Sequence, residues 1–140
     1  MKVLVLMDFT APARLALAFV RARMPHARVR LVHVLERSGL SAAFSTPSAG
    51  IGGSGEALDA TLSARLAEVQ AELRQLGGGE VIEGEPVEVA LRMAQAREVD
   101  LIVVGRDSPG LLSRMVAPSV VERLVKASPV PVLVIPGEGA

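Results

Sequence analysis

The last third of the chain holds the residues whose types and spacing could bind a phosphate group. A short apolar run, Leu101–Val104, ends at Gly105, as a buried strand ends where the backbone must turn sharply. Ser119 precedes Glu122 by three residues, which is the spacing of a helix-capping box. A strand, a glycine-containing loop and the amino end of a helix bring free backbone N–H groups and the positive end of a helix dipole together. The pattern therefore predicts a site suited to anions.

Few residues support any other chemistry. The chain has no cysteine, so it has no thiolate nucleophile, and its two histidines, His26 and His33, are too isolated for a metal cluster. We expect His33, inside an apolar run, to be a satisfied and partly buried side chain. Asp8 and Asp107 lack the nucleophile or metal that an acid–base pair would need. A nucleotidyl-transfer or flavin enzyme is disfavoured because there is no Walker sequence, no Gly-x-Gly-x-x-Gly and almost no aromatic ring. We therefore expect a protein that is not an enzyme, with no metal.

Strands and helices must alternate along the chain to position this site. Thr10 and Pro12 suit the start of a first helix, in which Leu15, Phe19 and Ala22 mark one face, and Pro86 suits the start of a third. Apolar runs predict strands at Val3–Met7, Val29–Leu35, Glu80–Glu83, Leu101–Val104 and Val130–Ile135, and helical spacing recurs from Leu58 to Leu76 and from Val120 to Lys126. This alternation predicts an α/β fold, with a parallel, doubly wound sheet and helices on both faces. The length of 140 residues suits a single domain spanning 1–140.

One segment differs from the rest in composition. Between Arg37 and Gly55 the chain is dominated by serine, glycine and alanine, and Pro47 interrupts it. Such a stretch buries too little surface to offset its ordering entropy, which predicts a mobile loop at about residues 37–56. Both a functional lid and a tolerated insertion agree with this composition.

Charge and hydropathy exclude two classes of partner. Fifteen basic and fifteen acidic residues cancel, so no net charge draws the protein to nucleic acid or anionic lipid. The apolar start of the chain ends at Asp8, too early for a signal peptide, and no run reaches membrane length, so we expect a cytoplasmic protein. A basic cluster near the end of the first helix is expected to be solvated surface, far from the anion site: Arg21, Arg23, His26, Arg28 and Arg30.

The last third also resembles the signature of universal stress proteins, which is a strand, Gly-x-x-Gly, nine residues, Gly-Ser/Thr, a helix and a final Pro-Val-Leu-Val strand. Gly105 takes the first glycine position, Ser108 the second and Pro118 the third, while Ser119 takes the hydroxyl position. The resemblance covers nearly all of the chain. It implies the strand order 3-2-1-4-5, and a ligand crevice where that order reverses, between the first and fourth strands.

Members of this family that bind nucleotides hold ATP in that crevice. Carried over by position, the resemblance implies that Asp8 faces the ribose and adenine end, that Val34 meets the adenine and that Val104 and Gly105 line the approach to the phosphates. The full set of candidate ligand residues is Asp8, Phe9, Thr10, Val34, Val104, Gly105, Ser108, Ser119 and Val120.

Two departures from the signature weaken the expected ligand site. Ser108 adds a side chain where glycine lets the loop approach a phosphate, and Pro118 has no N–H to donate. We therefore expect a stress-response interaction module with weak or absent ATP binding; the alternative is a universal stress protein in which ATP, or another adenine nucleotide, acts as a switch. We also expect a homodimer built on Val130–Ile135, since Pro131 favours an edge strand and a bare edge of valine, leucine and isoleucine invites pairing.

Overall fold

Five parallel strands form one sheet, in the order β3-β2-β1-β4-β5, which confirms the predicted order. The structure, a computed structural model, describes residues 1–36, 54–106 and 119–137. The strands are β1 (Lys2–Leu6), β2 (Arg28–Leu35), β3 (Glu80–Glu83), β4 (Leu101–Gly105) and β5 (Val132–Ile135). Each of them lies within two residues of the run that predicted it.

The central strand is β1, which pairs with β2 on one side and with β4 on the other. Its register runs from Lys2↔Arg28 to Leu6↔Val32 on the β2 side, and Val3 is opposite Leu101 on the β4 side. The chain order reverses at β1, because β2 and β3 lie on one side of it and β4 and β5 on the other. Ligands of such sheets bind outside the carboxyl ends of the strands at this point.

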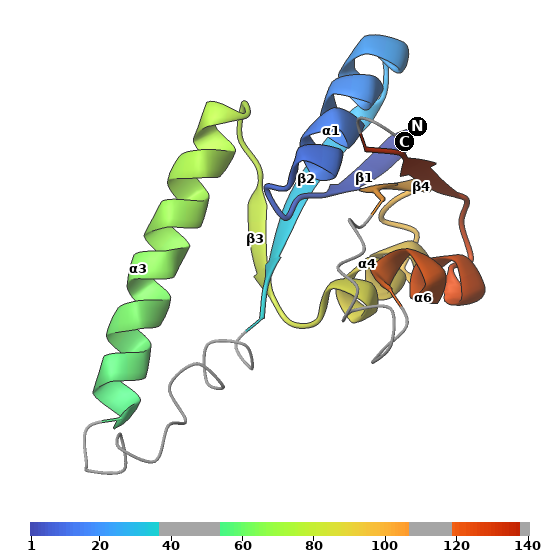
Figure 1. Ribbon diagram of the computed structural model, residues 1–140. Coiled ribbons are helices and arrows are strands. Elements are labelled where there is room, and N and C mark those ends of the chain that lie inside the picture. Colours follow the sequence, from blue (N-terminus) through green and yellow to red (C-terminus); the bar gives the residue numbers. More distant parts are fainter. Residues whose placement is uncertain (37–53, 107–118, 138–140) are drawn as a thin grey trace.

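Two helices cover each face of the sheet, as the doubly wound pattern predicts (Figure 1). Helices α1 (Ala11–Arg23) and α3 (Ser54–Gln75) share one core with the sheet, and α4 (Pro86–Gln95) and α6 (Val120–Ala127) share the other. Because side chains alternate along a strand, Val3 and Val5 point to the α1 side and Leu4 points to the α4 side. All three are fully buried.

The structure corrects the predicted inner face of α1. Its buried residues are Pro12, Ala13, Ala16, Leu17 and Val20, whereas Phe19 is 37% exposed and Ala22 is exposed as well. Leu15 is partly buried and packs against the α1-side core, so the predicted face is wrong for Phe19 and Ala22 and holds in part for Leu15. Small residues face the sheet at the start of the helix, because there its backbone comes close to Gly105 of β4, and large side chains would hold it away.

The structure also corrects the carboxyl end of the predicted loop. Helix α3 begins at Ser54, so residues 54–56 are helical and the prediction is wrong for them; the rest of the loop, 37–53, lies outside the described residues. In the described part of the chain, no helix is long and apolar enough to cross a membrane. The same residues bring no three potential metal ligands of the His, Asp or Glu types together.

Candidate functional site

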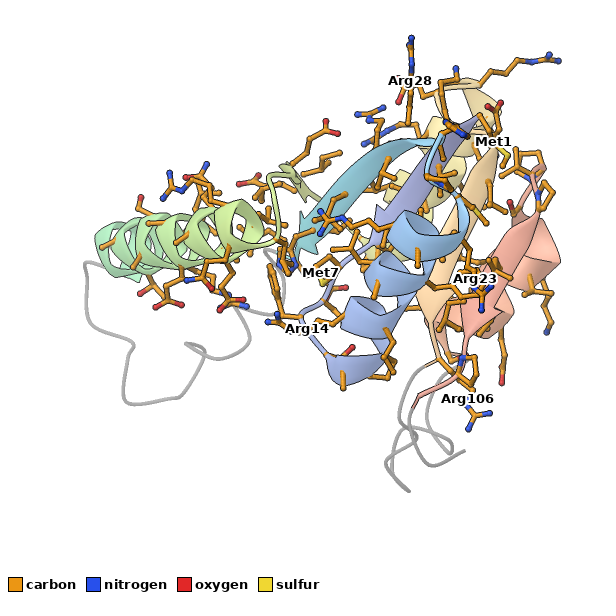
Figure 2. All side chains as sticks on the ribbon, turned by 90° about the horizontal axis from the view of Figure 1, so that it is seen from above. Met1, Met7, Arg14, Arg23, Arg28 and Arg106 are labelled. Atoms are coloured by element: carbon orange, nitrogen blue, oxygen red, sulfur yellow. The ribbon has the colours of Figure 1, made fainter. Side chains whose placement is uncertain are left out.

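The chain leaves β1 through a turn that β2 holds in place. The N–H of Met7 donates to the carbonyl of Val32 (2.8 Å), and Nδ1 of His33 donates to the carbonyl of Met7 (2.7 Å). His33 is 8% exposed, so the prediction of a satisfied, buried histidine is confirmed. Met7 and Arg14 lie near one another in Figure 2, at the opposite end of the sheet from Met1 and Arg28.

The residue after Asp8 has an unusual backbone conformation. Phe9 has φ of 64°, a left-handed value that costs a non-glycine residue free energy. Its ring lies against the His33 ring, with centroids 5.1 Å apart, and the Arg14 guanidinium lies 5.8 Å from the Phe9 centroid. Arg14 Nε also donates to the Phe9 carbonyl (3.2 Å). These contacts stabilise the left-handed conformation of Phe9, so that the chain turns after β1 and does not continue as a strand.

Asp8 and Thr10 form a compact polar turn at the start of α1. One carboxylate oxygen of Asp8, Oδ1, accepts from both the N–H and the hydroxyl of Thr10. The Thr10 hydroxyl in turn accepts from the N–H of Ala13 (3.4 Å), so Thr10 caps α1 as predicted. With Oδ1 engaged in this way, Oδ2 is the Asp8 oxygen that is left for a ligand hydroxyl.

Gly105 ends β4 directly beneath the first turn of α1. A Cβ atom added at this position would lie 2.3 Å from the carbonyl carbon of Pro12 and 2.5 Å from the nitrogen of Ala13. Those are backbone atoms, which cannot rotate away as a side chain could. Gly105 therefore allows the close approach between the strand end and the helix, which is a packing role in addition to the expected role in binding.

The other wall of the site comes from the amino ends of α4 and α6. Ser119 caps α6, since its hydroxyl oxygen accepts from the N–H of Glu122 (3.1 Å), as the predicted capping spacing requires. Glu85 caps α4 by accepting from the N–H of Glu88 (2.8 Å), and it also accepts from Arg123 of α6. Partial burial acts to raise the pKa of the Glu85 carboxyl, but the hydrogen bonds from Arg123 and from backbone N–H groups outweigh it, and the pKa is lowered.

These elements enclose a pocket of about 90 Å³ at the carboxyl ends of β1, β2 and β4. Most of its walls are apolar, and among the lining residues that the structure describes Asp8 is the only acidic one. The pocket is lined by Leu6, Met7, Asp8, Ala13, Val32, His33, Val34, Pro86, Val104, Gly105 and Val120. Pockets for drug-sized ligands usually measure about 300–1,000 Å³. The described walls therefore suit a flat ring or another small group rather than an entire nucleoside triphosphate.

The pocket brings together residues that are far apart in the sequence. Five of the nine candidate residues line it, and these are Asp8, Val34, Val104, Gly105 and Val120. Phe9, Thr10 and Ser119 are not among the lining residues, although Phe9 and Ser119 are each next to one in the sequence and Thr10 is two residues from Asp8. Ser108 lies outside the described residues, as do Asp107, Arg114 and Pro118. Sequence reasoning missed Pro86 as a wall and treated His33 as structural only. The signal for Pro86 was present, since a helix-starting residue after a parallel strand lies at the same edge of the sheet as the site.

The basic cluster is only partly the solvated surface that we expected. Arg28 is exposed at the far end of the sheet (Figure 2). Arg30, in contrast, forms ion pairs with Glu80 (2.8 Å) and with Glu98 (3.2 Å). Arg21 donates to the carbonyl of Leu76 and so ties α1 to the end of α3. Arg21 is exposed, as expected, and also connects two elements of the fold; Arg30 is only partly exposed, so the prediction of solvated surface is wrong in part for Arg30.

Comparison with known proteins agrees with this architecture. A search of curated protein sequences finds no match. Among solved structures, the universal stress protein UspA from Lactobacillus plantarum is 25% identical, with a TM-score of 0.73, and the match covers 96% of this chain and 97% of that one. An Arabidopsis thaliana universal stress protein family protein with AMP bound is 18% identical (TM-score 0.56; coverage 99% and 93%), and a universal stress protein in complex with cAMP is 19% identical (TM-score 0.59; coverage 96% and 95%).

The comparison with family models is the most direct. The model of the universal stress protein family matches residues 1–136, which is nearly the whole chain. Its match spans the turn after β1, the pocket residues of β2 and β4, and the capped start of α6. The chain belongs to the universal stress protein family.

Proposed function

We propose that this chain is a homodimeric stress-response module whose pocket at the ends of β1 and β4 takes an adenine nucleotide weakly, without turning it over. One observation carries the binding proposal: Asp8, Val34, Val104, Gly105 and Val120, from four separate segments, converge on one apolar pocket. The valines offer flat apolar walls to a base, and the free oxygen of Asp8 suits a ribose hydroxyl. Two members of the same fold were solved with AMP and with cAMP, which supports the choice of ligand class.

The part of the proposed site that would bind phosphate has fewer suitable groups than the part that would bind the base. The start of α6 supplies the Ser119 hydroxyl and the first N–H groups of the helix, which favour an anion. Pro118, directly before it, has no N–H, and Ser108 stands where the family signature has glycine. The donors at the start of one helix can bind a single phosphate group better than a chain of three. We therefore expect a monophosphate to bind at least as well as ATP.

Titration calorimetry with AMP, ADP and ATP tests this proposal. We expect dissociation constants above about 100 µM for ATP, and at least a tenfold gain, about 1.4 kcal/mol, when Ser108 and Pro118 are both changed to glycine. The matched control is Ser128→Gly, which makes a similar change at the far end of α6. A tight stoichiometric ATP complex of the unaltered protein would favour the nucleotide-switch alternative instead. If no adenine compound binds either protein, the ligand part of the proposal is wrong.

The dimer part of the proposal rests on the free edge of β5. Strand β5 lies at the end of the sheet, and its pairing within the described residues is with β4. The carbonyl of Pro131 accepts from the N–H of Ile102 in β4, and the carbonyl of Ile135 accepts from the N–H of Arg106, directly after β4. Because backbone groups alternate in direction along a strand, Val132 and Val134 direct theirs outward. An unpaired edge of this kind pairs readily with a second copy related by a two-fold axis.

Exposed apolar side chains flank this edge on both faces of the sheet. Phe19 lies on the flank of α1 opposite Arg21, which bonds to the end of α3, so Phe19 is on the β5 side. Val125, 60% exposed, lies on the flank of α6 opposite Arg123, which faces α4. A second copy paired on β5 would cover both side chains, which supports this edge as the dimer interface.

Light scattering on charged variants tests the dimer. We expect a mass near twice 14.6 kDa for the unaltered chain and at least a hundredfold weaker association for Phe19→Lys combined with Val125→Asp. The control, Ala18→Lys with Glu88→Asp, changes exposed positions away from β5. Leu133 is a poorer probe because its side chain packs against the α1-side core. A mass that stays at 14.6 kDa on concentration refutes the dimer, and a dimer that survives the double change is held elsewhere.

A further inference from the structure

We propose that the ion pair between Glu85 and Arg123 positions the amino end of α6 against α4, and with it Ser119 and Val120 of the candidate site. Glu85 and Arg123 are thus positioning residues, not ligands. The ligand consequence rests on the proposed nucleotide binding, whereas the positioning itself does not. The two residues are 38 positions apart in the sequence and belong to different helices.

The pair joins the starts of two helices through both carboxylate oxygens. Nη1 of Arg123 lies 2.7 Å from Oε1 of Glu85, and Nη2 lies 3.2 Å from Oε2. Two parallel hydrogen bonds fix the direction of the guanidinium as well as its distance. Glu85 is itself held, because Oε2 accepts from the N–H of Glu88 as the cap of α4. Arg123 is therefore anchored to a side chain that the α4 backbone already orients.

Packing alone holds the amino end of α6 only in part. Of its eight residues Leu124 is the only fully buried one, and Val120 and Val121 pack against the α4-side core but stay partly exposed. Apolar contacts of this kind set how close the helix lies to the core, and they fix its direction less tightly than a bidentate ion pair does. Arg123, next to Leu124, also donates its N–H to the carbonyl of Ser119 (3.1 Å), which closes the first turn. The side chain of Arg123 thus adds a directional restraint to the first turn of α6, which carries Ser119, beside the apolar contacts of Val120 and Val121.

The walls of the pocket lie on either side of this pair. Pro86, next to Glu85, and Val120, one turn before Arg123 and Leu124, both line the pocket. A change in the angle between α4 and α6 would therefore change the width of the pocket and move the Ser119 hydroxyl. A ligand that reaches only the base end touches β2 and β4 more than α6. The ion pair should accordingly matter more for a phosphate than for a base.

Amide hydrogen exchange of the ligand-free protein, measured by NMR, tests the positioning. In Arg123→Gln we expect the amides of residues 122 and 123 to exchange about fivefold faster, which is the size of effect that the loss of a bidentate ion pair with good geometry allows. The exchange rate of the Ser128 amide should change less than about twofold. The exchange rates of Arg123→Lys should lie between those of Arg123→Gln and the unaltered protein, because lysine keeps the positive charge but cannot form two parallel hydrogen bonds. The matched control is Lys126→Gln, which removes one positive charge from the other end of the same helix.

Calorimetry with AMP and adenosine on the same variants tests the ligand consequence. We expect Arg123→Gln to lower the affinity ratio of AMP to adenosine at least threefold, which a general loss of stability would not do. Unchanged exchange at Glu122, or equal acceleration at Ser128, overturns the positioning. Local acceleration with an unchanged ratio overturns the ligand consequence alone. If the unaltered protein binds neither compound, the proposed function fails, and the exchange experiment still decides whether Arg123 positions α6.

Discussion

Gly105→Ala is expected to destabilise the folded protein by about 3 kcal/mol, a large part of the 5–15 kcal/mol typical of a domain. The added Cβ would lie 2.3 Å from the Pro12 carbonyl carbon and 2.5 Å from the Ala13 nitrogen, far inside van der Waals contact. Only a shift of the first turn of α1 would relieve the overlap, and that turn carries the Thr10 cap beside Asp8. Urea unfolding followed by circular dichroism measures the change.

The control for this variant is Gly137→Ala. A Cβ added at Gly137 would lie 3.4 Å from the Pro12 side chain, which is ordinary contact, so we expect a change within about 0.5 kcal/mol. A Gly105→Ala protein within 1 kcal/mol of the unaltered one would mean that α1 does not approach β4 so closely. The expected loss also means that bulky residues at Gly105 are poor probes of nucleotide binding, because they change the fold first.

His33→Ala is expected to lower the free energy of unfolding by about 3 kcal/mol as well, for a different reason. The change removes the donor to the Met7 carbonyl and leaves a space beside the Phe9 ring. A buried carbonyl without a partner carries a desolvation penalty, and the space removes packing from a turn whose left-handed residue is held by its neighbours. The same urea unfolding experiment measures it, and any ligand affinity should fall too, since His33 lines the pocket.

His33→Asn separates the two contributions. Its side-chain N–H₂ can take the place of Nδ1 and donate to Met7, while the ring contact with Phe9 is lost. We expect it to recover at least about 1 kcal/mol relative to alanine. If alanine and asparagine are equally destabilising, the hydrogen bond contributes little and the ring contact dominates. A His33→Ala protein as stable as the original would contradict the role of this residue in the turn.

Much of the fold could be predicted because the signals are local. Apolar runs of four to eight residues locate strands, and caps such as Thr10 and Ser119 locate helix starts. The inner face of α1 could not be predicted in this way. Hydrophobicity favoured Phe19, which is exposed, whereas the approach of the helix to Gly105 favours small residues such as Ala13 at the start of the helix. That approach depends on a contact between segments about 90 residues apart, which periodicity does not contain.

The candidate site shows the same division. Asp8 comes shortly after β1 and Gly105 ends β4, so the topology implied by the family resemblance was sufficient to bring them together. The left-handed backbone of Phe9 has no signal in its residue type, because phenylalanine normally avoids that region. The ion pair between Glu85 and Arg123 has no signal in the sequence either, since each of the two residues could have paired with many other charged residues. Pairings of this kind follow from the angle between two helices and not from spacing.

The central place of β1 also affects the order in which the protein can assemble during synthesis. The first strand to be made, β1, has one neighbour, β2, that begins at Arg28, but its other neighbour, β4, begins only at Leu101. Until that point the chain has an apolar strand with one row of unpaired backbone groups, which is a template for wrong pairing. The contact of Val3 with Leu101 closes a long segment of chain, so it is costly in entropy and slow to form. Strand β1, at the centre of the finished sheet, is thus the strand with the longest stretch of chain between itself and its second partner.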